Sequence, residues 1–552
     1  MKPISVTAYR SHYASRQISH VSPVLLFLIV FSVTFGFALY TNHAWEDWYI
    51  TFRASKNLAM GNGLVFTPGE RLHTFTSPIG TLIPALLSYL VGKTNDDLVL
   101  WLFRIIGASL LGFSALLVLR SARQVMRNSQ AMLLAVAALA LDAKTIDYSI
   151  NGMETAFMIF FLSLLVYVLT VPVKYPVYGL ALVVAGLMWS RPDSFIYIGS
   201  VMAGFLAFNP PNRMAKSRVE WLSIFFRAGL LGLVLYLPWV IWAWWYYGTP
   251  VPNTITAKGL GAPDALTLAK EFILFPVTTL FSIDNSVHKT FAPAYMALGG
   301  WSSAIPLISK LFTFISIICW VLPFAKRSVR AWSLAAYLGH FYLSHVMPIC
   351  FPWYVPSVAF LSIWALALEF NSLQSWVALK RPRFVPLLNV FAGSVVAFQL
   401  VVLLCVAYQM RIQQRTIEVA NRKAIGTWLR ENARPGSTVF LECLGYIGFY
   451  SELKMYDYPG LSSKEMVSAR KAIGSNDYNK LIPYLKPDYL VVRPTDGINA
   501  AVLSQYQEMK RFDRSDEVRS YAFLPGRGYL QYDQVFTIYG RKTEPGQVPL
   551  VD

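Results

Sequence analysis

Two neighbouring carboxylates, Glu46 and Asp47, begin the first polar stretch after an apolar run at 22–41. Trp45 and Trp48 flank them, and tryptophan is enriched where a protein crosses the membrane–water interface. Two adjacent carboxylates in a place of low dielectric constant cannot both ionise freely without a cation or a shifted pKa. A carboxylate held there is able to take a proton from a hydroxyl group near a lipid head group. The simpler alternative is a solvated acidic turn.

Other ionisable side chains stand at the ends of apolar runs. Arginine's planar guanidinium suits phosphate oxygens, so Arg191 is a candidate phosphate ligand, although a local ion pair with Asp193 explains the pattern equally well. Lys258 lies on the outer segment 246–303, where its ammonium group either neutralises a phosphate leaving group or is simply solvated. Glu154 precedes an apolar run, a position that the helix macrodipole favours even without a functional role.

Membrane-spanning helices must position these residues. The 552-residue chain is 55% hydrophobic and 14% charged, and its mean hydropathy is +0.45. Soluble domains carry about 25% charged residues, so the chain is expected to be an integral membrane protein. Its four cysteines are too few and too scattered for a disulfide framework or a zinc site. No metal ligands are predicted, and a divalent cation is the one cofactor left open.

A spanning helix needs roughly 17–25 apolar residues, and the chain holds about eleven such runs. Seven are clear and four are shorter or interrupted by polar residues. The clear runs are 22–41, 98–119, 154–171, 222–245, 304–325, 353–370 and 385–408, and the shorter ones are 130–146, 176–190, 193–208 and 331–347. The segment 78–92 is short and contains two prolines, so we predict an interfacial or re-entrant helix on the outer side.

The basic residues support one orientation of these spans. If 78–92 does not cross, the cytoplasmic segments, including the N-terminal residues 1–21, hold sixteen Lys and Arg residues and one acidic residue, Glu220. This asymmetry follows the positive-inside rule, so the N-terminus is expected in the cytoplasm. The net charge of +18 therefore marks the cytoplasmic face and predicts no nucleic-acid partner.

The composition changes abruptly near residue 410. Residues 1–409 are expected to form the membrane domain, with the first outer loop at 42–97, and 410–552 an outer α/β domain. Runs 438–443 and 488–493 are typical of buried strands, whereas Arg411–Asn432 and Lys464–Ile473 look helical.

Several motifs occur together in the outer segments. After the acidic pair come Phe52-Arg53, Gly61-x-Gly63, Pro68-Gly69-Glu70 and Thr76-Ser77-Pro78, and later Gly152-Met153-Glu154-Thr155, Arg191-Pro192-Asp193 and Pro252-Asn253-Thr254. This series resembles a family of bacterial GT-C class glycosyltransferases, in the branch that includes the mycobacterial terminal arabinofuranosyltransferases. The family pattern begins Asp-Asp-Ala, so Glu46 and Trp48 depart from it. The bulk of Trp48 suggests a different acceptor or sugar.

The resemblance implies a fold and a set of roles. The fold is a polytopic α-helical, GT-C-like membrane protein with the outer α/β domain described above. Asp47 is the catalytic base or orients the acceptor, with Glu46 as the alternative. The donor phosphate would bind Arg53, Arg191 and Lys258. The sugar or the acceptor would contact the remaining candidates, which are His73, Asn151, Glu154, Asp193, Asn253 and Tyr354.

The predicted function is transfer of a sugar, such as arabinofuranose, from a polyprenyl-phosphate donor to a glycan or protein acceptor. The reaction would take place on the outer face of the bacterial inner membrane, at the surface of the lipid bilayer. Two alternatives come from other classes: a transporter or flippase for lipid-linked sugars, and a non-catalytic envelope assembly protein. A transporter would show ionisable residues in mid-span and related halves, and neither pattern is evident.

Overall fold

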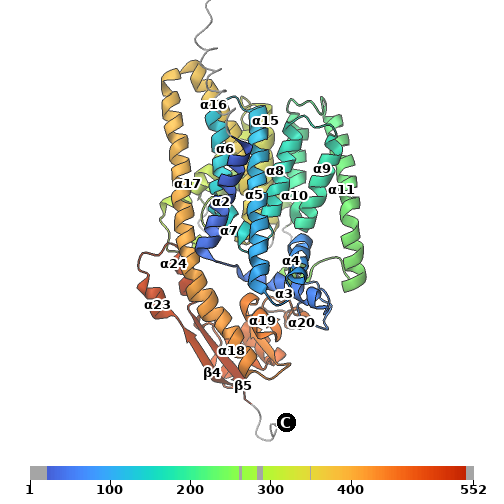
Figure 1. The fold of residues 1–552 in the computed structure, drawn as a ribbon, viewed down its shortest axis with the longest axis vertical. Coiled ribbons are helices and arrows are strands. Elements are labelled where there is room, and N and C mark those ends of the chain that lie inside the picture. The colour runs from blue at the N-terminus through green and yellow to red at the C-terminus, as the bar shows by residue number, and fades with distance from the viewer. Residues whose placement is uncertain (1–21, 260–263, 282–289, 348–349, 543–552) are drawn as a thin grey trace, which may run out of the picture.

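The computed structural model describes residues 22–259, 264–281, 290–347 and 350–542. Residues 1–21, expected on the cytoplasmic face, lie outside the described part. The described chain is a tall helical bundle with a small sheet at one end (Figure 1).

Six helical segments of this described part are long and apolar enough to cross a membrane. They contain α2 (Pro23–Thr41), α5 (Asp96–Val125), α11 (Arg218–Tyr247), α14 (Ala304–Ile318), α16 (Val355–Lys380) and α17 (Val385–Gln413). A bent pair, α6 (Ser129–Leu141) and α7 (Ala143–Ile150), adds a seventh if it counts as one span. The helix α16 is buried along most of its length and forms the centre of the bundle.

Shorter helices complete the bundle. They are α8 (Thr155–Thr170), α9 (Pro176–Ser190), α10 (Phe195–Phe208) and α15 (Arg327–Phe341), the last continued by a π-helical turn to Val346. Each of the eleven predicted apolar runs therefore contains a helix, while the number that cross the membrane stays a prediction.

Two local features differ from the predicted pattern. The run 130–146 is not one straight helix, since α6 and α7 meet at 46°. Asp142 at the corner accepts a hydrogen bond from the Thr145 amide at 2.9 Å and so begins a new helix. The outer segment 246–303, expected as a loop, contains α12 (Asn253–Lys258) and α13 (Ala265–Phe281).

The first outer segment folds as two helices at the lower end of the bundle, α3 (Glu46–Met60) and α4 (Pro78–Leu90) (Figure 1). At 13 residues, α4 is too short to span, in keeping with the predicted interfacial helix. Its first turn is capped by Ser77, whose hydroxyl accepts from the Gly80 amide at 2.9 Å.

The C-terminal region, defined here as residues 414–542, contains a five-stranded sheet of order β2-β1-β3-β5-β4. The strands are β1 (Thr438–Leu441), β2 (Lys454–Asp457), β3 (Tyr489–Val492), β4 (Tyr506–Asp513) and β5 (Val535–Arg541). The first three are parallel, and β5 runs antiparallel to β3 and β4. The two predicted strands, β1 and β3, are thereby confirmed.

Helices cover both faces of this sheet. One face packs on α18 (Ala424–Asn432) and α19 (Gly445–Ser451), and the other on α20 (Lys464–Ile473) and α21 (Tyr478–Leu485). The remaining short helices are α22 (Ala500–Leu503), α23 (Ser515–Ser520) and α24 (Arg527–Tyr532). The burial of β1 and β3 on both faces explains their unbroken apolar sequences.

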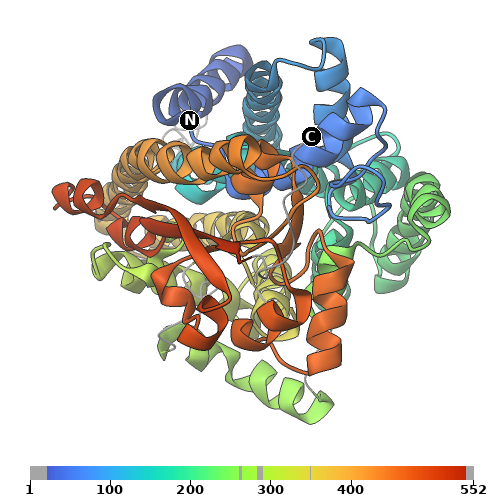
Figure 2. The same cartoon turned by 90° about the horizontal axis from the view of Figure 1, so that it is seen from below.

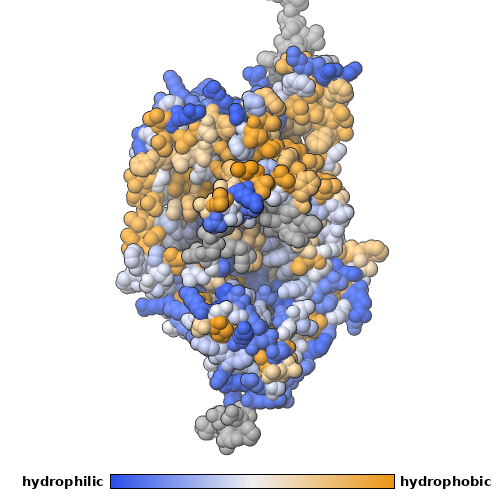
Figure 3. Space-filling model, turned by 180° about the vertical axis from the view of Figure 1, so that it is seen from behind, coloured by the Kyte–Doolittle hydropathy of each residue, from blue (hydrophilic) through white to orange (hydrophobic). Residues whose placement is uncertain are grey.

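The bundle and the sheet are joined by a continuous helical path. The π-helical segment η8 (Gln414–Lys423) follows α17 directly and leads into α18, so the predicted boundary at 410 falls inside this path. Seen from below, the C-terminal region covers the end of the bundle beside α3 (Figure 2). On the face shown in Figure 3, apolar side chains cover most of the bundle and hydrophilic side chains gather at both ends.

Candidate active site

The acidic pair forms the first turn of α3. The Trp45 amide donates to the Asn151 carbonyl oxygen at 3.0 Å, which ties the start of α3 to the turn between α7 and α8. The first-turn amides have no partner within the helix, so a carboxylate is favoured at this end. The two carboxylates nevertheless have different surroundings.

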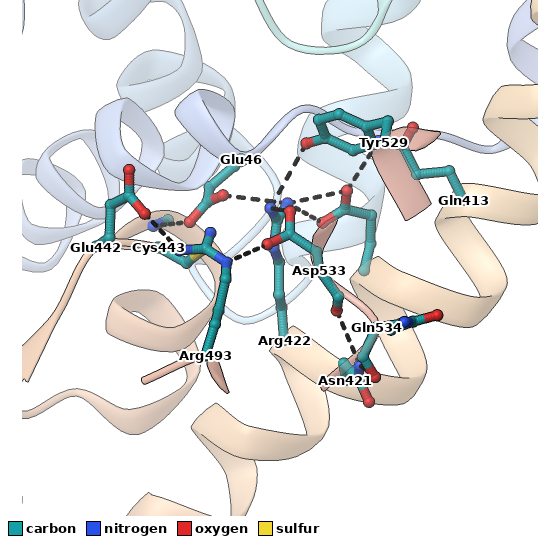
Figure 4. Close-up of polar contacts among 12 residues, drawn as sticks. Glu46, Gln413, Asn421, Arg422, Glu442, Cys443, Arg493, Tyr529, Asp533 and Gln534 are labelled. Carbon is teal, nitrogen blue, oxygen red and sulfur yellow. Dashed lines mark hydrogen bonds and ion pairs between the residues drawn. The ribbon is translucent and has the colours of Figure 1, made fainter. Parts of the chain in front are cut away.

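Glu46 is held at both oxygens by the C-terminal region (Figure 4). The Gly445 amide donates to Oε1 at 3.1 Å, and Oε2 lies 3.1 Å from Nη1 of Arg422. Burial raises the pKa of Glu46 to about 7, against the opposing effect of Arg422. This carboxylate is therefore already engaged by protein groups.

Asp47 makes no ion pair with any residue that the structure describes. Burial raises the pKa of its carboxyl group to about 6. The nearby Lys258 ammonium lowers that pKa and the Glu154 carboxylate raises it, so both groups lie within electrostatic reach. A carboxylate with a pKa near neutrality and no bound partner is suited to accept a proton.

Arg191, which pairs with Glu154, lies in the turn between α9 and α10. Its guanidinium contacts Glu154 at 3.3 Å (Nη1 to Oε1) and Asp193 at 3.0 Å (Nε to Oδ1). It also stacks on the ring of Tyr354, with 3.9 Å between Cζ and the ring centre. The predicted local pair with Asp193 therefore exists, but as one contact of a larger arrangement.

Lys258 reaches the same tyrosine from α12. Its Nζ lies 3.4 Å from the Tyr354 hydroxyl oxygen and 4.7 Å from the centre of the Phe351 ring. Tyr354 therefore stands between the two cations. We call Asp47, Glu154, Arg191, Lys258 and Tyr354 the open cluster, because its aspartate and its lysine have no ion-pair partner among the described residues.

Six predicted site residues lie outside this cluster. Two have been described above: Glu46 is held by the C-terminal region, and Asp193 pairs with Arg191. The other four have partners elsewhere. Arg53 donates to the carbonyl oxygens of Gly448 at 2.6 Å and Leu453 at 3.1 Å, so its guanidinium links α3 to the C-terminal region. His73 stacks on the Tyr247 ring at 4.6 Å, and burial lowers its pKa to about 4. Both side chains are buried, and their predicted roles in binding stay predictions.

The two asparagines also have structural partners. Asn151 is fully buried and its amide nitrogen donates to Asp147 Oδ1 at 2.5 Å. Asn253 donates to the carbonyl oxygens of Gly460 at 2.7 Å and Leu461 at 3.1 Å. Asn253 lies on α12 and so contributes to placing Lys258.

Trp48, the bulky departure from the family pattern, points away from the open cluster. Its ring stacks on Phe52 at 4.9 Å, and a Cβ atom added to Gly152 would lie only 2.5 Å from the Trp48 Cβ. Gly152 also has φ of +99°, so both its backbone conformation and the close approach of Trp48 require glycine there. The side chain fills the core, and its effect on the choice of sugar or acceptor stays a prediction.

A second charged group, absent from the sequence predictions, lies behind Glu46 (Figure 4). Arg422 contacts Glu418 at 2.8 Å and Asp533 at 2.5 Å, and Asp533 also pairs with Arg493 at 2.6 Å. We call Glu46, Glu418, Arg422, Arg493 and Asp533 the closed cluster, because each charge has an opposite partner. The i, i+4 spacing of Glu418 and Arg422 was the one sequence signal available for it.

The described residues contain no group of three or more His, Cys, Asp or Glu side chains placed to hold a metal ion.

Comparisons with known proteins identify the fold. A family model described as a domain of unknown function (DUF8728) matches residues 408–539, and no curated protein matches the chain. The crystal structure of ArnT from Cupriavidus metallidurans bound to undecaprenyl phosphate is similar over 94% of this chain and 98% of ArnT, with a TM-score of 0.50 and 13% identity. The cryo-EM structure of arabinofuranosyltransferase AftD from mycobacteria matches 94% of this chain and 40% of AftD, with a TM-score of 0.42 and 14% identity.

The likeness to ArnT confirms the predicted resemblance to GT-C glycosyltransferases at the level of the fold. A fold alone does not establish an activity, which must be argued from the site.

Proposed function

We propose that this chain is a glycosyltransferase that moves a sugar from a polyprenyl-phosphate donor to an acceptor on the outer face of the bacterial inner membrane. Arabinofuranose is the sugar that we propose, and a cell-envelope glycan or a surface protein is the acceptor. The observation that carries the proposal is the open cluster, in which the unpaired Asp47 carboxylate lies within electrostatic reach of Lys258 and Glu154, and Glu154 in turn pairs with Arg191.

In this proposal Asp47 is the base. It takes the proton of the acceptor hydroxyl group while the hydroxyl oxygen attacks the anomeric carbon of the donor sugar. The bond between that carbon and the phosphate oxygen breaks, and polyprenyl phosphate leaves with the bonding electron pair. Arg191 and Lys258 stabilise the charge that develops on the phosphate, since fixed cations act strongly in a site that excludes water.

The other members of the cluster have supporting roles. Glu154 and Asp193 hold the Arg191 guanidinium in one orientation, and Tyr354 separates it from Lys258. Glu46, the alternative base, has both oxygens occupied, so we assign it to holding the first turn of α3.

An apolar cavity of about 970 Å³ supports a lipid-linked donor. Helices α6, α14, α16 and α17 line it with side chains that include Leu141, Ile305, Phe312, Ile363, Phe391 and Val402. Asp142 at its rim precedes α7, whose Tyr148 stacks on Trp45 at 5.0 Å. In this proposal a hydrocarbon chain lies in the cavity, and its phosphate end extends past α7 toward the open cluster. The ArnT structure, which holds undecaprenyl phosphate, has the same fold.

Transfer from radiolabelled polyprenyl-phosphate arabinofuranose tests the activity. Membranes containing the chain should consume the donor and label an acceptor, as separated by thin-layer chromatography. Donor that crosses the bilayer without hydrolysis would favour the flippase alternative. Donor that is neither consumed nor moved across the bilayer would favour an assembly protein.

Accessibility labelling tests the sidedness. Met60, at the end of α3, is exposed, so a cysteine placed there in a cysteine-free chain should react with a membrane-impermeant maleimide added to the outside of spheroplasts. Reaction only after the membrane is opened would place α3 in the cytoplasm and contradict the proposal.

A further inference from the structure

Two arginines of the C-terminal region reach the bundle, one on each side of the open cluster. Arg422 contacts Glu46, the residue before Asp47, at 3.1 Å. Arg470 donates from Nη1 to the carbonyl oxygen of Ala257, the residue before Lys258, at 2.6 Å. We propose that Arg422 and Arg470 are positioning residues, through which the C-terminal region sets the places of the base and of the phosphate-binding lysine. This inference rests on the proposed function.

On the α3 side, the contact is rigid and leaves Arg422 no freedom to bind substrate. Glu418 and Asp533 take the other faces of its guanidinium, at 2.8 and 2.5 Å. The backbone also approaches closely, since a Cβ atom on Gly445 would lie 2.0 Å from the Glu46 carbonyl oxygen. Glu46 is thus fixed from two directions, and Asp47 follows it in the same helical turn.

On the α12 side, the C-terminal region binds both ends of a six-residue helix. At its first residue, the Asn253 amide donates to the carbonyl oxygens of Gly460 and Leu461. At its last turn, Arg470 bridges the carbonyl oxygens of Ala257 and Pro459, the latter at 2.8 Å.

The loop 458–462, whose carbonyl oxygens accept hydrogen bonds from Asn253 and Arg470, is itself held by a buried carboxylate. Asp457 accepts from the Leu461 amide at 2.5 Å, from the Ser462 amide at 2.8 Å and from the Ser462 hydroxyl at 2.6 Å. A continuous set of hydrogen bonds therefore runs from β2 through this loop to α12 and Lys258.

The helix α12 needs this support because it is short. A helix of six residues is not stable without tertiary contacts, so α12 takes its place from what it touches. A displacement of about 1 Å at a reacting group costs roughly 10²-fold in rate. Two outer segments that are far apart in the sequence are thus positioned by contacts with the same C-terminal region.

We call the Arg422 contacts the α3 arm and the Arg470 contacts the α12 arm. Loss of each arm should change a different kinetic constant. Arg470→Ala loosens the phosphate-binding lysine, so the donor KM is expected to rise about tenfold while kcat changes by less than about threefold. Arg422→Lys keeps the charge but cannot reach Glu46, Glu418 and Asp533 together. We expect it to lower kcat about tenfold or more with little change in donor KM, as should Glu46→Gln.

The measurement is steady-state transfer by the purified full-length chain, with radiolabelled polyprenyl-phosphate arabinofuranose as the donor. Arg430→Ala is the matched control, because Arg430 makes an exposed pair with Glu452 at 3.5 Å and touches neither arm. It should behave as wild type. Variants that lose folded protein but keep wild-type kcat and KM in the folded fraction would overturn the proposal.

Hydrogen exchange gives a readout that does not depend on activity. Arg470→Ala should speed amide exchange in residues 253–259 about tenfold and leave β3 unchanged. Unchanged exchange there would refute the α12 arm even if the wild-type chain transferred no sugar from this donor. A wild-type chain without transfer, but with the expected exchange, would overturn the proposed function alone.

Discussion

The open and closed clusters contain the same kinds of side chain and lie on either side of the start of α3, yet they differ in how their charges are paired. In the closed cluster each carboxylate contacts an arginine, and the side chains of Glu418 and Asp533 are almost completely buried. In the open cluster Asp47 and Lys258 influence each other without an ion pair among the described residues. The adjacent residues Glu46 and Asp47 thus belong to different clusters. Pairing indicates a structural role, and an unpaired carboxylate that faces cations indicates a chemical one.

The largest difference between the clusters is expected in activity. Asp47→Asn removes the base and should lower transfer about 10²–10⁴-fold. The midpoint of thermal unfolding should not fall, since folding raises the pKa of Asp47 and a neutral side chain avoids that cost of ionisation. Rate and midpoint should be measured on the same preparation.

The closed cluster should respond in stability instead. Asp533→Ala leaves Arg422 and Arg493 short of a partner, and removing one member of a buried pair costs about 3–5 kcal/mol. The control is Asp513→Ala, which breaks an exposed pair with Arg511 and should change stability by less than about 1 kcal/mol. Equal midpoints for the two variants would remove the distinction between the clusters.

A smaller effect is expected at the phosphate side. Lys258→Met removes one charge-assisted contact of about 1.5–3 kcal/mol, which corresponds to a ten- to hundredfold rise in donor KM. Donor titration at fixed acceptor measures it. An unchanged KM would show that Lys258 is a solvated lysine, as one reading of the sequence allowed.

The pH dependence distinguishes the two carboxylates most finely. The base works in its ionised form, and the pKa of Asp47 is about 6. Transfer should therefore be constant above pH 7 and fall about tenfold per pH unit below pH 6. If Glu46 were the base, with its pKa of about 7, the fall would begin one unit higher. The profile of kcat/KM between pH 5 and 8 decides between them.

The sequence predicted much of this arrangement. Apolar runs located the helices, shorter apolar runs located β1 and β3, and the candidate site residues included every member of the open cluster. The family pattern joined Asp47, Glu154, Arg191 and Lys258, which are far apart in the chain but meet in the structure. These residues stand at the starts or ends of helices, where short polar motifs stand out against apolar surroundings.

The closed cluster could not be predicted in the same way. Arg422 and Asp533 are 111 positions apart, and neither stands in a motif. Arg53 and Trp48 were interpreted by their chemistry, whereas their contacts decide their roles, and contacts depend on how α3 docks on α19 and α5. The bend at Asp142 was equally hidden, because one capping hydrogen bond interrupts a run that is apolar throughout.

The most direct test of the central claim is donor consumption by Asp47→Asn beside wild type, in detergent, with radiolabelled polyprenyl-phosphate arabinofuranose. The account predicts that the wild-type chain releases polyprenyl phosphate and labels an acceptor. It predicts that the variant, folded and able to bind the donor, does so at least about 10²-fold more slowly. Transfer by the variant at the wild-type rate would contradict the assignment of Asp47 as the base.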